Sequence, residues 1–189
     1  VWSCGCASGE EPYSLAIMFS EALKNTKLNF KIIATDINSH AIRDARNGNY
    51  TSDNLKNLDD ILITKYFNKV TTDHYQVTKE IKDLVSFNLA DITTFPASYM
   101  DVIFCRNLLI YYGKDAQDLI FKKCFNVLKP NRFLVLGMDE TLMKNLAGQL
   151  YALRPRLHRS GGTHFAAPRK PLRAKSVTYV LGTNCYLCV

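Results

Sequence analysis

VWSCGCASGEEPYSLAI, residues 1–17, passes from a short apolar run through a loop of small residues into an amphipathic pattern. The opening VWSCG predicts the end of a buried strand, and EEPYSLAIMFSEAL, residues 10–23, predicts a helix. Pro12 suits the first helical turn, where Glu10 and Glu11 complement the helix dipole. Such a loop lets a ligand approach the backbone and the helix N-terminus. A simple turn stays the alternative, because the loop matches neither GxGxxG nor a GK pair followed by Ser or Thr.

The first 140 residues continue to alternate short apolar runs with helical patterns. This alternation predicts an α/β fold, a doubly wound parallel sheet covered by helices. The further strands that we expect are FKIIATD (30–36), LVSFNLAD (84–91), MDVIFCRN (100–107), RFLVLGM (132–138) and, at an edge, QLYALRPRLHR (149–159). The further helices are SHAIRDARNG (39–48) and KDAQDLIFKKCFNVLKP (114–130), the second ended by Pro130.

Residues 49–83 break this rhythm and predict a small insertion. One helical stretch spans residues 53–62. Apolar and polar residues then alternate on both sides of Thr72-Asp73, which predicts an antiparallel hairpin between Tyr66 and Ile81. We therefore expect residues 66–81 to form a β-subdomain.

The net charge of +7 is confined to the C-terminal part of the chain of 189 residues. Residues 151–189 hold seven Lys and Arg and no acidic residue, whereas residues 1–150 balance 17 basic against 17 acidic residues. This asymmetry is typical of an appendage and argues against a nucleic-acid groove across the domain. We expect a catalytic domain over residues 1–160 and a basic tail over residues 161–189, with nucleic-acid or membrane-surface binding by that tail as the alternative.

The six cysteines and the apolar runs predict a protein of the reducing cytoplasm with no metal site. Cys105 and Cys124 lie in apolar patterns, where cysteine behaves as a small buried hydrophobe. Cys185 and Cys188 form a single CxxC without the second pair that a zinc site needs. No run reaches the roughly 20 apolar residues of a membrane helix, so we expect no membrane insertion.

Polar residues follow the predicted strands where each strand ends. Asp36 lies 27 residues after Gly9, close to the distance at which an acidic residue binds ribose hydroxyls in dinucleotide-type folds, although capping of the next helix is an alternative. Asn88 and Asp91 lie just beyond the next strand, and Arg106 with Asn107 interrupts the apolar run of IFCRNLLIYY. The carboxyl ends of parallel strands share one edge, so these groups predict a cofactor cleft.

These segments resemble one known family. VWSCGCASGEEPYSLAI, ATDIN, SFNLAD and CRNLLIYY, in this order, are similar to the chemotaxis-receptor methyltransferases of CheR type over about residues 1–142. LYALRPRLHR shows a weaker similarity to the last strand of the family. The resemblance implies a Rossmann-like S-adenosylmethionine-dependent methyltransferase. It implies methyl transfer to glutamate side chains in the cytoplasmic domain of chemoreceptors, with S-adenosylhomocysteine as product.

The resemblance also implies roles for individual residues. Asp36 would bind the cofactor ribose, Asn88 and Leu89 would lie beside the adenine, and Tyr111 matches the active-site tyrosine of the family. The Tyr111 ring has an equally good interpretation as a half-buried aromatic beside the sheet. The implied cofactor-binding residues are Glu11, Asp36, Asn88, Leu89, Arg106 and Asn107.

The chain also departs from the family pattern. In the family, an N-terminal helical domain precedes the segment at which this chain starts. We therefore expect this chain to be a fragment of a longer protein, and the fragment lacks that domain. GMDETL stands where the family usually has a Gly-His-Ser sequence. The hairpin turn has no glycine, so we expect no docking of a receptor peptide. Two alternatives remain: a non-catalytic signalling module, and a methyltransferase for another carboxylate or small molecule.

Overall fold

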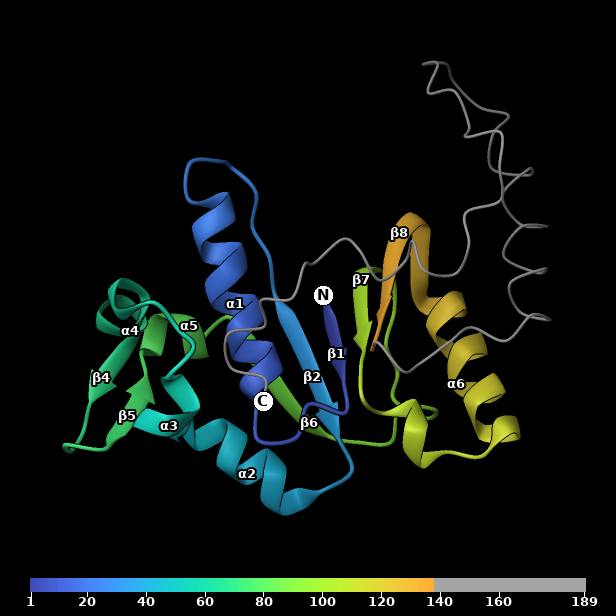
Figure 1. The fold of residues 1–189 in the computed structure, drawn as a ribbon. Helices are drawn as coiled ribbons and strands as arrows, with labels where there is room; N and C mark the ends of the chain where they lie inside the picture. The colour runs from blue at the N-terminus through green and yellow to red at the C-terminus, as the bar shows by residue number, and fades with distance from the viewer. Residues whose placement is uncertain (138–189) are drawn as a thin grey trace.

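The computed structural model describes residues 1–137, and its main element is a parallel sheet of five strands in the order β6-β2-β1-β7-β8 (Figure 1). Every neighbouring pair is parallel, as the doubly wound prediction requires. The strands are β1 (Trp2–Cys4), β2 (Ile32–Asp36), β6 (Val85–Leu89), β7 (Met100–Cys105) and β8 (Leu128–Leu136).

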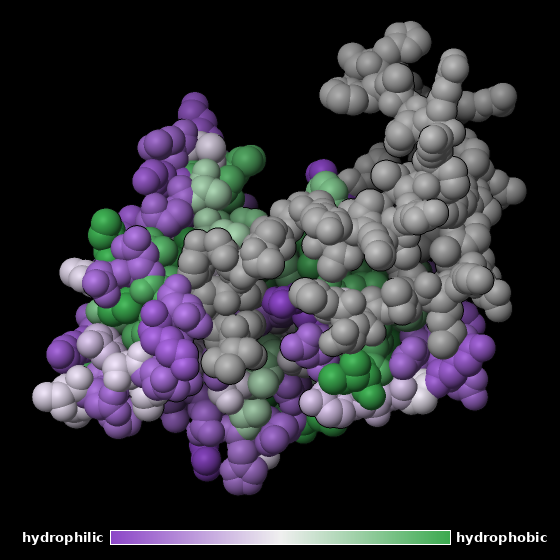
Figure 2. Space-filling model, in the orientation of Figure 1, coloured by the Kyte–Doolittle hydropathy of each residue, from purple (hydrophilic) through white to green (hydrophobic). Residues whose placement is uncertain are grey.

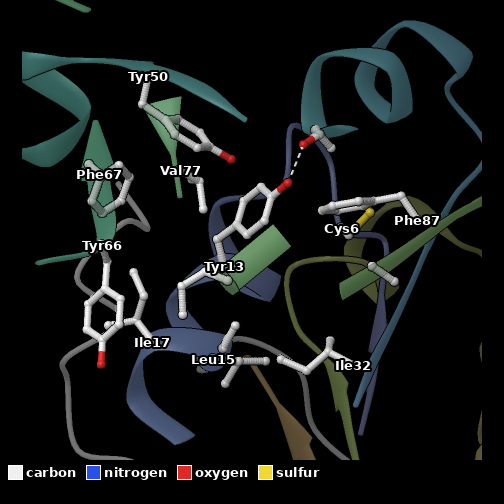
Figure 3. Packing of buried hydrophobic residues seen from close by; sticks show 14 of the residues in the cluster. Cys6, Tyr13, Leu15, Ile17, Ile32, Tyr50, Tyr66, Phe67, Val77 and Phe87 are labelled. Atoms are coloured by element: carbon white, nitrogen blue, oxygen red, sulfur yellow. Dashed lines mark hydrogen bonds between the residues drawn. The ribbon is translucent and has the colours of Figure 1, made fainter. Parts of the chain in front are cut away.

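Helices cover both faces of this sheet. The helices α1 (Glu10–Leu23) and α2 (Ser39–Asn47) pack in one apolar cluster, and α6 (Lys114–Val127) packs in a second. Figure 3 shows the first cluster, in which the Tyr13 hydroxyl donates a 2.9 Å hydrogen bond from α1 to the Ala45 carbonyl of α2. The alternation of side chains along β1 explains the division, because Trp2 and Cys4 belong to the second cluster while Ser3 faces α1.

The insertion forms a separate antiparallel sheet in the order β3-β5-β4. Its strands are β3 (Asn49–Thr51), β4 (Phe67–Lys69) and β5 (His74–Val77), accompanied by α3 (Ser52–Leu55), α4 (Asp60–Tyr66) and α5 (Lys79–Lys82). The predicted hairpin is confirmed as β4 and β5, whereas β3 is a strand that the sequence patterns did not predict. Figure 2 shows that hydrophilic residues predominate on the visible face of this region.

Two predicted helices have different bounds. The single helix over residues 53–62 is wrong, because Asp59 is extended and its carboxylate accepts a hydrogen bond from Ile61 N at 2.7 Å, which starts a new helix. The last helix ends at Val127, and Pro130 lies within β8. Proline pushes the preceding residue toward extended backbone, so the helix stops before the proline is reached.

Residues 138–142 of GMDETL, the predicted strand over residues 149–159, the tail and the CxxC pair lie outside the described residues. No helix within residues 1–137 is long and apolar enough to cross a membrane.

Candidate functional site

The loop between β1 and α1 folds back onto the end of β2. Gly5 N and Cys6 N both donate to the Thr35 carbonyl, at 2.8 and 3.0 Å. Gly5 has φ of 69°, and a Cβ at this position would lie 2.8 Å from Leu108 Cδ1. The loop therefore needs glycine here for its backbone conformation and for its close approach to the β7–α6 connection.

Asp36 is fixed by two backbone donors. Its Oδ2 accepts from Ala7 N and its Oδ1 from Asn38 N, both at 2.8 Å. Each carboxylate oxygen offers about two acceptor positions, so each retains capacity for a ligand hydroxyl. The cap of α2 is Asn38, whose side chain accepts from His40 N and Ala41 N. Asp36 is therefore not the N-cap of α2, although its bond from Asn38 N supports the residue that is.

Glu11 lies in the first turn of α1 and joins two strands. Its Oε1 accepts from Ser3 Oγ of β1 at 2.7 Å, and its Oε2 pairs with Arg106 Nη1 at 3.4 Å. The Glu11 and Arg106 side chains are only 12% and 27% exposed. The pair therefore holds the start of α1 against the ends of β1 and β7.

A small open cleft lies at the carboxyl ends of the strands. Its walls combine one carboxylate with apolar and aromatic side chains. The lining residues are Gly5, Thr35, Asp36, Ile37, Ala90, Ile92, Leu108 and Tyr112. Of the predicted site residues, Asp36 lines this cleft. The loop between β1 and α1 meets the ends of β2 and β6 there, as expected.

The other predicted residues surround the cleft without lining it. Leu89 is paired in register with Asp36 and is 55% exposed, so it offers apolar surface beside the carboxylate. The Asn88 amide donates to the Ser86 carbonyl at 3.0 Å and to the Ala34 carbonyl at 3.5 Å. Asn107, two residues after the end of β7, has a left-handed backbone with φ of 53°.

Tyr111 and Tyr112 lie at the end of a short 3-10 helix (Leu109–Tyr111) and differ in exposure. The Tyr111 side chain is 80% exposed and does not line the cleft, whereas Leu108 and Tyr112 do. The 3-10 helix covers only residues 109–111 and Tyr112 has an extended backbone, so helical spacing within LLIYY does not identify Tyr112. The catalytic role of Tyr111 stays a prediction.

Around the site, the surroundings keep the Cys6 thiol protonated and the Asp91 carboxylate ionised. Burial raises the pKa of the Cys6 thiol to about 12, so it is no nucleophile at neutral pH. Hydrogen bonds from the Thr93 hydroxyl and backbone hold the pKa of Asp91 below its usual range. Within residues 1–137, no group of three or more His, Cys, Asp or Glu side chains is arranged to hold a metal ion.

Residues 1–153 match a family model described as the CheR methyltransferase, SAM binding domain. The chain is 40% identical over 151 residues to a chemotaxis protein methyltransferase of Borreliella burgdorferi, covering 77% of this chain and 53% of that protein. It is 35% identical over 147 residues to the Escherichia coli protein of the same name, covering 74% and 51%. The chain thus spans about half the length of the curated relatives it matches.

Among solved structures, a magnesium protoporphyrin IX methyltransferase of Synechocystis PCC 6803 with bound SAH is similar at a TM-score of 0.42 and 16% identity. The match covers 85% of this chain and 54% of that one, and its score is too low to support an inference.

Proposed function

Because this chain belongs to the CheR methyltransferase family, we propose that it methylates glutamate side chains in the cytoplasmic domains of chemoreceptors. The methyl donor is S-adenosylmethionine, and S-adenosylhomocysteine is released. Two kinds of support carry this proposal. The family model describes a domain that binds this cofactor, and both relatives are named chemotaxis protein methyltransferases.

The observation that carries the cofactor assignment is the carboxylate of Asp36. It lies at the carboxyl end of β2, lines the cleft and is oriented by Ala7 N and Asn38 N. Its remaining acceptor positions suit the two hydroxyls of a ribose. Gly5 also lines the cleft, and its lack of a Cβ lets the loop pack directly against Leu108, another lining residue.

When bound, S-adenosylmethionine supplies an electrophilic methyl group on its sulfonium. The residues of the chain then have an orientation task, because a glutamate carboxylate is already ionised at neutral pH and needs no general base. Glu11 and Arg106 fix the loop and strand ends that form the cleft. Tyr111, exposed beside the cleft-lining Tyr112, is the proposed hydrogen-bond donor to the incoming carboxylate.

Calorimetric titration with S-adenosylhomocysteine tests the cofactor assignment. We expect the 189-residue chain to bind it and Asp36→Ala to weaken binding about 10-fold or more, since hydrogen bonds to a charged group are lost. Asp44→Ala is the matched control, because Asp44 is an exposed carboxylate on α2 away from the cleft lining. Equal affinities for the wild type and Asp36→Ala would contradict the assignment.

Transfer of a labelled methyl group tests the reaction. We expect incorporation into a chemoreceptor cytoplasmic fragment as a methyl ester, which alkaline treatment releases as methanol. Binding of the cofactor without any transfer would favour the non-catalytic signalling module. Transfer to a small carboxylate, but not to the receptor, would favour the other methyltransferase alternative. The cytoplasmic location, the absence of peptide docking and the domain boundary at residue 160 stay predictions.

A further inference from the structure

The cleft contains a tyrosine hydroxyl, that of Tyr112, to which the proposed reaction assigns no role. Three lining residues carry polar side chains: Thr35, Asp36 and Tyr112. The Thr35 hydroxyl is buried and accepts a 3.0 Å hydrogen bond from Trp2 Nε1, and Asp36 is held by backbone donors. The Tyr112 hydroxyl forms no hydrogen bond within residues 1–137. It is therefore available to a ligand in the cleft.

The backbone around Tyr112 is firmly positioned. Tyr112 N donates to the Leu109 carbonyl at 3.0 Å. The Gln117 amide of α6 donates to both the Leu109 and Tyr112 carbonyls, each at 2.9 Å. A ring attached to a backbone held in this way needs little reorganisation when a ligand binds.

The surroundings of Tyr112 keep its hydroxyl protonated, so the hydroxyl can donate a hydrogen bond. Burial raises the pKa of Tyr112 above the usual value for a phenol, and the carboxylates of Asp91 and Asp36 raise it further. The phenol therefore keeps its proton at neutral pH. Asp36 and Ala90 line the same cleft as Tyr112, so Tyr112 faces a cleft that the ends of β2 and β6 also line.

The remaining walls are apolar. Ile37, Ile92 and Leu108 line the cleft together with the Tyr112 ring. Ile37 is 65% exposed, so its side chain presents aliphatic surface beside Asp36. Aliphatic walls with an aromatic ring and one convergent donor suit a flat heteroaromatic base, and the carboxylate beside them suits a sugar.

We propose that Tyr112 is a cofactor-binding residue whose ring packs on the adenosyl half of the cofactor and whose hydroxyl donates a hydrogen bond to it. This inference rests on the proposed function, because it assigns the cleft to S-adenosylmethionine. We assign Tyr112 to the adenosyl half of the cofactor, because Asp36 would bind the sugar and the apolar walls would contact the base.

Calorimetry with two probes tests this assignment. S-adenosylhomocysteine and 5′-methylthioadenosine share the adenosyl group, and only the first carries the amino-acid half. We expect Tyr112→Phe to weaken both about 3- to 10-fold, the effect of one neutral hydrogen bond. Tyr112→Leu also removes the aromatic surface, so it should weaken both by more. Tyr99→Phe, at an exposed tyrosine outside the cleft lining, is the matched control and should change neither affinity.

The outcomes separate this inference from the proposed function. If the wild type binds both probes and Tyr112→Phe and Tyr112→Leu bind as tightly, the role of Tyr112 is overturned while the methyltransferase proposal stands. A loss seen with S-adenosylhomocysteine alone would overturn the adenosyl assignment. A folded wild type that binds neither probe would overturn both proposals. Thermal unfolding of each variant verifies that the folded protein is compared.

Discussion

Glu11 shows how one carboxylate organises the entrance of the site. It accepts from Ser3 Oγ and pairs with Arg106, while Ser3 is fully buried. Glu11→Ala would leave the Ser3 hydroxyl without this acceptor and the guanidinium without this partner. We expect a loss of about 1–3 kcal/mol in the free energy of unfolding, measured by urea denaturation.

Glu10 supplies the matched control in the same helical turn. Burial raises the pKa of Glu10, so its charged form is disfavoured by its surroundings. We expect Glu10→Ala to change the free energy of unfolding by less than about 0.5 kcal/mol. If the two variants lose the same free energy of unfolding, the stabilisation comes from a negative charge near the helix N-terminus and not from the contacts of Glu11.

Gly5 gives a second prediction at the scale of one residue. Its φ of 69° and the 2.8 Å separation between an added Cβ and Leu108 Cδ1 both disfavour a side chain. We expect Gly5→Ala to cost about 1–3 kcal/mol in the free energy of unfolding and to weaken binding of S-adenosylhomocysteine.

Gly113 is the control for that substitution. An added Cβ there meets no atom within 4 Å, and its φ of −66° is open to any residue. Gly113→Ala should change the free energy of unfolding by no more than about 0.5 kcal/mol. The reduced conformational freedom of the unfolded chain offsets the weaker helix cap. A Gly5→Ala variant as stable as Gly113→Ala would argue against a constrained loop.

At the scale of elements, Glu21 connects α1 to α4. Its carboxylate accepts from Lys65 Nζ and the Tyr66 hydroxyl, each at 2.6 Å, and from Lys24 Nζ at 3.2 Å. Hydrogen bonds from Lys65, Tyr66 and Lys24 lower the pKa of Glu21 from 4.5 to about 2. A lowered carboxylate pKa contributes stability above the unfolded value, and this stability is lost as the pH falls from 4.5 toward 2.

The Glu21→Gln variant tests this connection. We expect it to be less stable than the wild type at pH 7 and to approach the wild type near pH 2–3, measured by urea midpoints at each pH. Glu80→Gln is the control, because Glu80 on α5 forms no ion pair among the described residues. A difference between Glu21→Gln and the wild type that is constant from pH 7 to pH 2.5 would contradict the linkage.

The predictability of an element depended on its local signals. The bounds of α1 were predicted residue for residue, because small residues precede it and its apolar face is continuous. The strand β3 was missed, since its pairing with β5 lies 23 or more residues away along the chain. The break between α3 and α4 rests on one side-chain hydrogen bond of Asp59, which periodicity does not reveal.

At the scale of the whole molecule, the topology of the sheet made the site predictable in outline. Parallel strands bring their carboxyl ends to one edge, so the sequence alone assigns Asp36 to a cleft. The orientation of side chains within a three-residue turn depends on packing against α6 and the strands. For this reason the sequence pattern did not distinguish Tyr112, which lines the cleft, from the exposed Tyr111.

The same sheet couples two apolar clusters, which predicts how the molecule unfolds. Trp2, the one tryptophan of the chain, is fully buried in the second cluster, and Leu15 of α1 is buried in the first. Both clusters use side chains of β7 and β8, so loss of one removes support from the other. We expect Leu15→Ala to lower the free energy of unfolding by about 2–5 kcal/mol.

The coupling is tested by the Trp2 fluorescence, which reports from the opposite face of the sheet. In urea, fluorescence and far-ultraviolet circular dichroism should give one coincident transition in the wild type, and Leu15→Ala should shift both midpoints equally. Leu119→Ala is the control, because Leu119 on α6 is 57% exposed and should leave both midpoints nearly unchanged. A dichroism transition that moves while the Trp2 transition stays in place would mean that the two faces unfold independently. In a single shared sheet, independent unfolding would require strands to keep their hydrogen bonds after one of the two packed faces is lost.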